Sequence, residues 1–286
     1  MARLVNILKH WIFFQKSLEI KKEIGDRRGT AASLNNIGIV HDHLGDYSEA
    51  LDFFQGSLKI IKKIGDRRGE ALTLNNIGIS TRCLGKSSKA LEFHKQSLKI
   101  SEEIGDRRVE AACFINIGII NDNLGEFSKA LESYQRSLKI QKEIGDREGE
   151  TASLLSIGKI FTEKNDFSSA EKYYNKALLI AREIKSKLLL ADVCLDIASL
   201  YLVKGNLTDA KKSLKQALSI ANELGSKVIK AMVLCLSARL YTKEKKWDKA
   251  KYSFKESISI LKETKDTFKL TSVYYYKARL NRQYIP

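Results

Sequence analysis

The tetrapeptide Ile-Gly-Asp-Arg occurs four times in the chain, at residues 24–27, 64–67, 104–107 and 144–147. The copies are spaced by 40 residues each time. A second motif, Ser-Leu-x-Ile, keeps the same register and begins at Ser17, Ser57, Ser97 and Ser137. A fixed period of this length is the signature of a repeat architecture, in which each unit buries its apolar face against the next.

Two columns of small residues extend the register toward the C-terminus. One begins with glycine and continues with alanine, at Gly38, Gly78, Gly118, Gly158, Ala198, Ala238 and Ala278. The other is alanine throughout, at Ala50, Ala90, Ala130, Ala170, Ala210 and Ala250. Small residues at fixed positions indicate helices that approach closely. The column of Phe54, His94, Tyr134, Tyr174, Leu214 and Phe254 would fill the adjacent space.

Each 40-residue unit contains the pattern of two helices. Hydrogen-bond acceptors suited to a helix start occupy one position in every unit, at Asp26, Asp66, Asp106, Asp146, Ser186, Ser226 and Asp266. A second break follows Gly45 and its counterparts, and we expect the second helix to be capped by Ser48, Ser88, Ser128, Ser168, Thr208 and Asp248. In the first unit these signals predict helix A over residues 27–44 and helix B over residues 49–64.

The register predicts an all-α fold, a right-handed superhelical solenoid of antiparallel helix pairs covering residues 1–286. It divides into an N-terminal half-repeat (1–25), six 40-residue helix pairs (26–265) and a C-terminal capping helix (266–286). The single proline, Pro286, leaves the helices uninterrupted. The last helix is expected over residues 267–284, with Lys277 facing solvent where earlier units carry isoleucine.

Composition excludes several functional classes. Hydrophobic residues make up 43% and charged residues 29%, as in folded soluble proteins. No apolar run reaches the roughly 18 residues of a membrane span, and no secretory signal is recognisable. Four scattered cysteines without a Cys-x-x-Cys pair suggest buried thiols in a reducing cytoplasm. No metal site, cofactor or catalytic motif is predicted, so the chain is not expected to be an enzyme.

Gly38, Ala50, Phe54 and Ser57 together resemble the tetratricopeptide repeat. The repeat is 40 residues long rather than the usual 34. With its Asn-Ile-Gly and Ile-Gly-Asp-Arg segments it is most similar to the G-protein-signalling-modulator (Pins-like) adaptors, and related repeats occur in kinesin light chains and prokaryotic scaffolds. The resemblance implies a non-enzymatic adaptor that binds a peptide in a concave groove lined by the A helices.

The family's geometry selects the groove residues on each A helix. These are Asn35, Ile39, Asn75, Ile79, Arg82, Ile119, Lys159 and Arg239, together with the neighbouring amides Asn36, Asn76 and Asn116. Stacked amides suit a peptide main chain because each offers a donor and an acceptor. Alternatively, they brace adjacent repeats. The adaptors often carry Asn where this chain has Ile39, Ile79, Ile119 and Lys159, which favours a more apolar peptide in the front half.

Charge is concentrated near the C-terminus. Residues 201–286 contain 19 Lys and Arg against 7 Asp and Glu, whereas residues 1–200 contain 31 against 27. We expect a basic patch there, formed by Lys211, Lys212, Lys215, Lys245, Lys246 and Lys249. Such a patch would bind nucleic acid or an acidic partner surface in a salt-sensitive manner, which is the alternative function; solubility alone is the other explanation.

Two further hypotheses remain. The chain could be a peptide-sensing regulator whose superhelix changes pitch on binding. Trp11, Phe13 and Phe14 belong to a B helix that lacks its own A helix unless residues 1–9 supply part of it. If these side chains are uncovered, we expect weak self-association through the N-terminal half-repeat.

Overall fold

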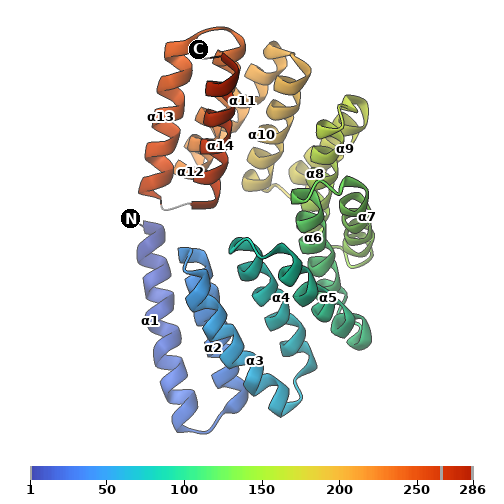
Figure 1. Ribbon diagram of the computed structural model, residues 1–286, viewed down its shortest axis with the longest axis vertical. Coiled ribbons are helices and arrows are strands. Elements are labelled where there is room, and N and C mark those ends of the chain that lie inside the picture. Colours follow the sequence, from blue (N-terminus) through green and yellow to red (C-terminus); the bar gives the residue numbers. More distant parts are fainter. Residues whose placement is uncertain (1, 265–266, 285–286) are drawn as a thin grey trace. The chain divides into compact units, whose positions relative to one another are not determined.

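The computed structural model describes residues 2–264 and 267–284, and within these residues the chain forms fourteen α-helices and no strand (Figure 1). It divides into two compact units, Met1–Gly145 and Asp146–Pro286, which are described separately. The predicted all-α solenoid of helix pairs is confirmed. The organisation of residues 1–286 as one continuous solenoid stays a prediction. Within the same described residues, no helix is long and apolar enough to cross a membrane.

The helices alternate between two types. The A helices are α2 (Arg27–Leu44), α4 (Arg67–Cys83), α6 (Arg107–Asn123), α8 (Arg147–Glu163), α10 (Lys187–Lys204), α12 (Lys227–Lys243) and α14 (Thr267–Tyr284). The B helices are α1 (Ala2–Glu23), α3 (Tyr47–Ile64), α5 (Ser87–Ile104), α7 (Phe127–Glu143), α9 (Phe167–Glu183), α11 (Leu207–Glu223) and α13 (Trp247–Glu263). The predicted bounds of α2 and α14 are confirmed.

Each A helix begins as the sequence predicts. The Asp26 carboxylate accepts a hydrogen bond from the backbone N–H of Gly29 at 2.8 Å, and Asp66, Asp106, Asp146, Ser186 and Ser226 cap their helices in the same way. Asp266 lies outside the described residues. The glycine before most of these caps has a positive φ, for example 73° at Gly65, which residues with a Cβ rarely adopt. Glycine therefore ends one helix and aspartate starts the next.

The predicted caps of the B helices are wrong. Helix α3 begins at Tyr47, so Ser48 lies inside its first turn and the N-cap is Asp46. The same two-residue shift applies to Ser88, Ser128, Ser168, Thr208 and Asp248. The physical reason is the tight link after Gly45, because the backbone N–H of Ala50 already bonds to the carbonyl of Asp46 at 3.0 Å. Only Asp166 and Asn206 cap their B helices with a side chain among the described residues.

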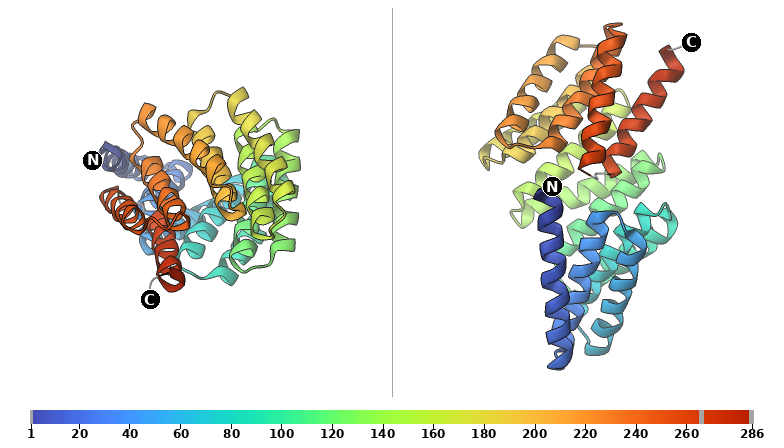
Figure 2. Two further views of the ribbon diagram at one scale, coloured as in Figure 1. Left: turned by 90° about the horizontal axis from the view of Figure 1, so that it is seen from above. Right: turned by 90° about the vertical axis from the view of Figure 1, so that its left-hand side faces the viewer.

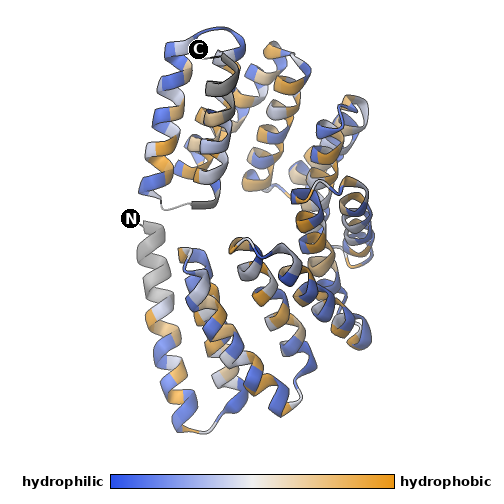
Figure 3. Cartoon of the chain, viewed as in Figure 1, coloured by the Kyte–Doolittle hydropathy of each residue, from blue (hydrophilic) through white to orange (hydrophobic). Residues whose placement is uncertain are grey.

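Within each unit, the helices of a pair pack side by side and antiparallel (Figure 2). A ring on the B helix covers the small residue of the A helix. A Cβ added at Gly118 would lie 2.5 Å from Cε1 of Tyr134, and one at Gly38 would lie 2.6 Å from Cε1 of Phe54. Hydrophobic and hydrophilic residues alternate along the helices, as amphipathic packing requires (Figure 3).

The serine of Ser-Leu-x-Ile links the two helices of a pair. Ser57 Oγ is fully buried and donates a hydrogen bond to the carbonyl of Ala31 at 2.7 Å. Ser97, Ser137 and Ser257 form the equivalent bond to Ala71, Ala111 and Ala231. Ala177 and Ala217 occupy the same position in α9 and α11, so those two pairs lack this hydroxyl. The motif therefore marks a buried polar contact rather than a surface feature.

Among the described residues, ion pairs connect the start of five A helices, α4, α6, α8, α10 and α12, with the end of the B helix that follows each. Arg67 binds Glu103 and also Glu70, the latter at 2.8 Å. Arg107 and Arg147 repeat this double contact with Glu110, Glu143, Glu150 and Glu183. Lys187 and Lys227 keep only the contact with the B helix, to Glu223 and Glu263. The second arginine reaches the next repeat, because Arg28 binds Asp66 and Arg68 binds Asp106. The Ile-Gly-Asp-Arg motif thus supplies a turn, a cap and a cation.

The ring column contains one histidine, His94, in a fully buried position. Its Nδ1 lies 2.9 Å from Oδ1 of Asn75. Its Nε2 has no hydrogen-bond partner among the described residues. Burial, reinforced by the positive charge of Arg82, lowers the pKa of His94 to about 4. His94 therefore serves as a neutral core ring.

The cysteines are thiols that the fold encloses to different degrees. Cys113, Cys194 and Cys235 are buried, and burial raises the pKa of each thiol to about 11. Cys83 is half-buried, and burial also raises its pKa. The sequence-based interpretation as buried small residues is confirmed for the first three.

Replacing Ser57 with Ala should lower the free energy of unfolding by about 0.5–1.5 kcal/mol, because one buried hydrogen bond to Ala31 is lost without creating a cavity. Urea denaturation followed by circular dichroism measures the change. Ser88→Ala on the surface of α5 is the control and should change stability by less than about 0.5 kcal/mol. Equal effects in the two variants would contradict the proposed role of the buried hydroxyl.

Stability should fall as pH drops from about 6.5 to about 4, because the unfolded chain accepts a proton on residue 94 that the folded chain refuses. Above the unfolded pKa the buried ring causes no loss of stability, and the loss grows to about 1–3 kcal/mol as the pH approaches 4. His94→Phe, which copies Phe54, should flatten this part of the pH profile. The exposed His43 is the control, and His43→Asn should keep the wild-type slope. An unchanged slope in His94→Phe would disprove the assignment.

Candidate functional site

Each A helix carries accessible side chains between buried ones. Ile39, Ile79 and Ile119 are half-buried, although the residues immediately before and after them are buried. Lys159 is exposed at the equivalent position of α8, and Ser199 and Arg239 are half-buried on α10 and α12. We call this position and the position three residues earlier the A-helix face. It comprises Asn36, Ile39, Asn76, Ile79, Asn116 and Ile119 in the first unit, and Ser156, Lys159, Asp196, Ser199, Leu236, Arg239 and Tyr276 in the second.

In the first unit the asparagines form a ladder between successive A helices. Asn76 Nδ2 donates to Asn35 Oδ1 at 3.1 Å, and Asn116 Nδ2 donates to Asn75 Oδ1 at 3.1 Å. Thr73 Oγ1 also approaches Asn35 Oδ1, at 3.5 Å. These hydrogen bonds brace adjacent repeats, and they join side chain to side chain rather than side chain to backbone. The ladder explains why the Asn-Asn pair recurs in α2 and α4.

Asn75 is the most constrained of these amides. It is buried, and its Oδ1 accepts from Asn116, lies 2.9 Å from His94 Nδ1 and is approached by Cys113 Sγ at 3.8 Å. Asn36 differs, because it is half-buried and has no side-chain hydrogen-bond partner among the described residues. Of the predicted amides, Asn36 is therefore the one whose donor and acceptor groups are both unused among the described residues.

Arg82 and Asp42 lie one turn further along α4 and α2. Arg82 is half-buried, and its Nε has no hydrogen-bond partner among the described residues. Asp42 Oδ1 accepts a hydrogen bond from Ser80 Oγ at 2.6 Å, which again joins two A helices. The first unit thus presents isoleucines flanked by amides and by one arginine.

The second unit presents charges at the same positions. Lys159 Nζ lies 3.3 Å from Asp196 Oδ2, and its side chain keeps 54% of its accessible surface. The Asp196 carboxylate raises the pKa of Lys159, so this lysine is positively charged at neutral pH. Burial raises the pKa of Asp192, one turn before Asp196, and the neighbouring Asp196 carboxylate adds to this effect. The ion pair therefore joins α8 and α10, and the side chain of Lys159 remains accessible to solvent.

Arg239 organises the other end of this face. Its guanidinium lies over the ring of Tyr276, with 4.4 Å from Cζ to the ring centroid. One of its nitrogens, Nη1, donates to Ser199 Oγ at 3.2 Å. Arg239 thus bridges α10, α12 and α14. A guanidinium has five N–H donors, so one hydroxyl leaves donors for another acceptor.

Sequence reasoning missed Asp192, Asp196 and Tyr276. Asp196 and Tyr276 stand in the same column as Asn36, Asn76 and Asn116. The residue type in this column changes from amide to carboxylate and phenol, so the amide pattern ends with the third unit. The 40-residue register alone would have placed Asp196 and Tyr276 on the A-helix face.

The predicted basic patch lies elsewhere. Lys211, Lys212 and Lys215 are exposed on α11, Lys249 is exposed on α13, and Lys245 and Lys246 lie in the link between α12 and α13. Lys211 and Lys246 both bind Glu244, the latter at 2.8 Å. These two lysines lower the pKa of Glu244, so it stays ionised and neutralises part of the patch. Four of the six lysines remain as exposed cations outside that pair.

At the N-terminal half-repeat, α1 exposes part of its apolar surface. Phe13 is 66% exposed and Ile12 is 48% exposed, whereas Trp11 and Phe14 are half-buried. The side chains of residues 1–10 lie outside the described part. Self-association through this surface stays a prediction.

Comparison with known proteins agrees with the architecture. The tetratricopeptide repeat model matches residues 12–63, 41–103, 69–143, 110–183 and 190–263. Among curated proteins, no sequence matches the chain.

Several solved structures share the fold at low sequence identity. A Rap protein complexed with competence and sporulation factor is 17% identical with a TM-score of 0.72, covering 93% of this chain and 72% of its own. The quorum sensor NprR of B. thuringiensis is 16% identical with a TM-score of 0.66, covering 97% and 84%. Aspartyl phosphate phosphatase F of Bacillus subtilis is 15% identical with a TM-score of 0.70, covering 94% and 74%.

These likenesses concern the fold alone, because the identities are low. The repeat model, in contrast, matches most of the sequence directly, and its matches follow the 40-residue register seen in the helices. The chain belongs to the tetratricopeptide repeat family.

Proposed function

We propose that the chain is a non-enzymatic adaptor that binds a peptide segment of a partner protein along the A-helix face. The observation that carries the proposal is the recurrence of accessible residues at the same positions of successive A helices, between buried neighbours. Such a row presents side chains at regular spacing, which suits a bound peptide. The Rap protein complexed with competence and sporulation factor and the quorum sensor NprR supply the analogy.

The two units favour different peptide chemistry. In the first unit, Ile39, Ile79 and Ile119 suit apolar side chains, while Asn36 can bond to a peptide group. In the second unit, Arg239 suits a carboxylate, because its guanidinium is held flat by Tyr276 and is permanently charged. The proposed ligand of the second unit is therefore an acidic peptide segment.

The alternative is a nucleic-acid-binding or acidic-surface-binding module that uses the exposed lysines of α11 and α13. It is supported by the excess of 19 cations over 7 anions in residues 201–286. Against it, Glu244 already engages two of the lysines. A peptide-sensing role would add a conformational change to the same face. We propose a cytoplasmic location, in keeping with the free thiols.

Arg239→Ala should weaken binding of a partner recovered by affinity purification about ten- to a hundred-fold, because a hydrogen bond to a charged group contributes about 1.5–3 kcal/mol. Fluorescence anisotropy with a labelled partner peptide measures the dissociation constant. The matched control is Arg136→Ala, since Arg136 also lies over a ring, Phe114, but belongs to a B helix. Equal losses in both variants would place the binding site off the A-helix face.

Raising salt from about 50 to 200 mM should reduce the partner's affinity by less than about ten-fold if the A-helix face holds it through mixed apolar and polar contacts. Binding to phosphates by the lysine patch would instead fall by about 10³–10⁵ for six to ten contacts. The triple variant Lys212→Glu, Lys215→Glu and Lys249→Glu should leave peptide binding unchanged. A steep salt dependence that this variant abolishes would establish the alternative.

A further inference from the structure

The first repeat breaks the ion-pair rule that the other repeats follow. The cation that opens each A helix pairs with a glutamate 36 residues later in five successive repeats, from Arg67–Glu103 to Lys227–Glu263. For Arg27 the residue at that position is Lys63. The first-turn glutamate of α4, α6 and α8 is also replaced, by Thr30. Arg27 therefore lies where two carboxylates are expected, and neither is present.

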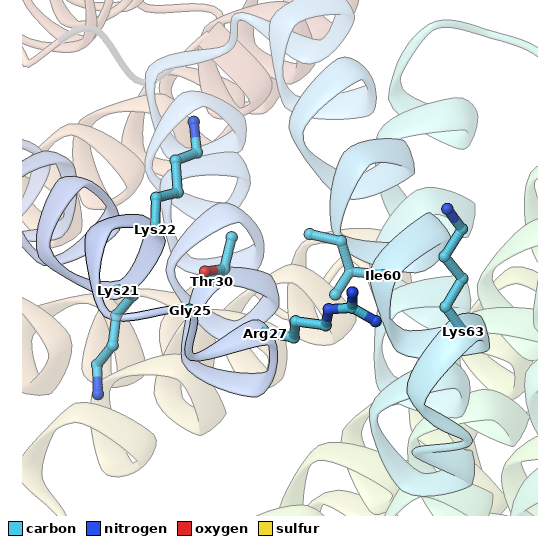
Figure 4. Close-up of a pocket in the computed structure, with 7 residues that line it drawn as sticks. All are labelled: Lys21, Lys22, Gly25, Arg27, Thr30, Ile60 and Lys63. Atoms are coloured by element: carbon cyan, nitrogen blue, oxygen red, sulfur yellow. The ribbon is translucent and has the colours of Figure 1, made fainter.

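A pocket occupies this place. Its volume is about 400 Å³, and it is lined by Lys21, Lys22, Gly25, Arg27, Thr30, Ile60 and Lys63 (Figure 4). The lining comes from the end of α1, the start of α2 and the end of α3. Figure 4 shows the Arg27 guanidinium extending toward Ile60 and Lys63. The three helix ends thus line an open pocket with four cationic side chains.

Most of this positive charge is uncompensated. Lys21 Nζ bonds to Asp26 at 2.9 Å, and Figure 4 shows its side chain turned away from Arg27. Asp26 also accepts a hydrogen bond from Gly29 N–H as the helix cap, so its carboxylate is engaged. Lys22, Arg27 and Lys63 form no ion pair within residues 2–264 and 267–284. Relative to the second repeat, two negative charges have been lost and one positive charge gained.

We propose that this pocket binds a doubly charged oxyanion, a phosphate group either free or carried by a larger ligand. Its charge replaces that of the two carboxylates which hold the equivalent arginine in α4, α6 and α8. Arginine presents a planar fork that matches phosphate oxygens, and the lysines add point charges. A phosphate offers more acceptor oxygens than one carboxylate. It can therefore accept from Arg27 while the flexible side chains of Lys22 and Lys63, which extend away from the guanidinium in Figure 4, turn toward it.

The site is separate from the proposed peptide-binding face. Arg27 opens α2, whereas Asn36 and Ile39 lie more than two turns further along the same helix. The pocket also needs Lys63 from α3, a B helix that contributes nothing to the A-helix face. Failure of one proposal therefore does not affect the other.

The test is isothermal titration calorimetry of the full chain at constant ionic strength, with inorganic phosphate, O-phosphoserine and succinate as probes. Both phosphates should bind with a stoichiometry of one, and at least ten-fold more tightly than succinate. Tighter binding of O-phosphoserine than of inorganic phosphate would indicate a phosphate carried by a larger ligand, and the reverse would indicate a free ion. Equal responses to phosphate and succinate, or none to either phosphate, would overturn the proposal.

Restoring the missing carboxylates should abolish the site. Thr30→Glu with Lys63→Glu copies Glu70 and Glu103 and should weaken phosphate binding at least ten-fold, and Lys63→Glu alone should do so if the double variant fails to fold. Lys59→Glu, one turn earlier on α3 and outside the pocket, is the charge-matched control and should change affinity less than two-fold. Unchanged binding in Lys63→Glu would also overturn the proposal.

The reverse exchange offers a gain of function. Glu70→Thr with Glu103→Lys recreates the first-repeat residues around Arg67, and the stoichiometry of phosphate binding should rise from one to two. A stoichiometry of one in this variant, with its melting transition intact, would show that the exchanged residues do not define the site.

Discussion

Close packing of a ring against a glycine holds four helix pairs together, from α2 and α3 to α8 and α9. Tyr134 lies so near Gly118 that a Cβ there would sit 2.5 Å from the ring, and Phe54 meets Gly38 in the same way. Because the ring occupies the space of a missing side chain, the two helices approach closely and only one side of each A helix is used. The buried serine hydroxyl then bonds to the partner helix at a single register. The accessible residues of the A-helix face lie on the side of each A helix that this packing does not bury.

Polar contacts supplement the packing of the helix pairs and lie mainly at the ends of the helices. The Ile-Gly-Asp-Arg links carry the caps and the ion pairs at the ends of the helices, where solvent screens them, so each exposed pair contributes about 0–1 kcal/mol. These ion pairs contribute little free energy, but they recur at the same positions in five successive repeats. Since the backbone repeats faithfully, a departure from the pattern such as Lys63 reports a local change of chemistry. The pocket at Arg27 lies where the first repeat departs from the pattern.

The A-helix face changes character between the two units although its positions do not. In the first unit, amides bond to one another between helices, as Asn116 does with Asn75. In the second, Lys159 pairs with Asp196 and Arg239 stacks on Tyr276. Each arrangement keeps neighbouring A helices in contact while leaving side chains accessible. Inter-repeat bracing and the proposed ligand binding thus involve neighbouring positions of the A helices. Asn75 is buried and bonded to Asn116, whereas Asn36 is half-buried and has no side-chain hydrogen-bond partner among the described residues.

The sequence by itself determined the repeat length, the family, the bounds of α2 and α14 and the caps of the A helices, because each depends on local signals repeated every 40 residues. It misplaced the B-helix caps, since the link after Gly45 is tighter than serine preference suggests. Only the tertiary structure decided which amides brace adjacent repeats. Asn76 bonds to Asn35 and Asn116 bonds to Asn75, and the two residues of each pair are 41 positions apart in the chain. The tertiary structure likewise decided that Arg27 and Lys63, 36 residues apart, line one pocket. Hydrogen bonds and charges act through space, and local sequence patterns do not record which distant groups come within a few ångströms.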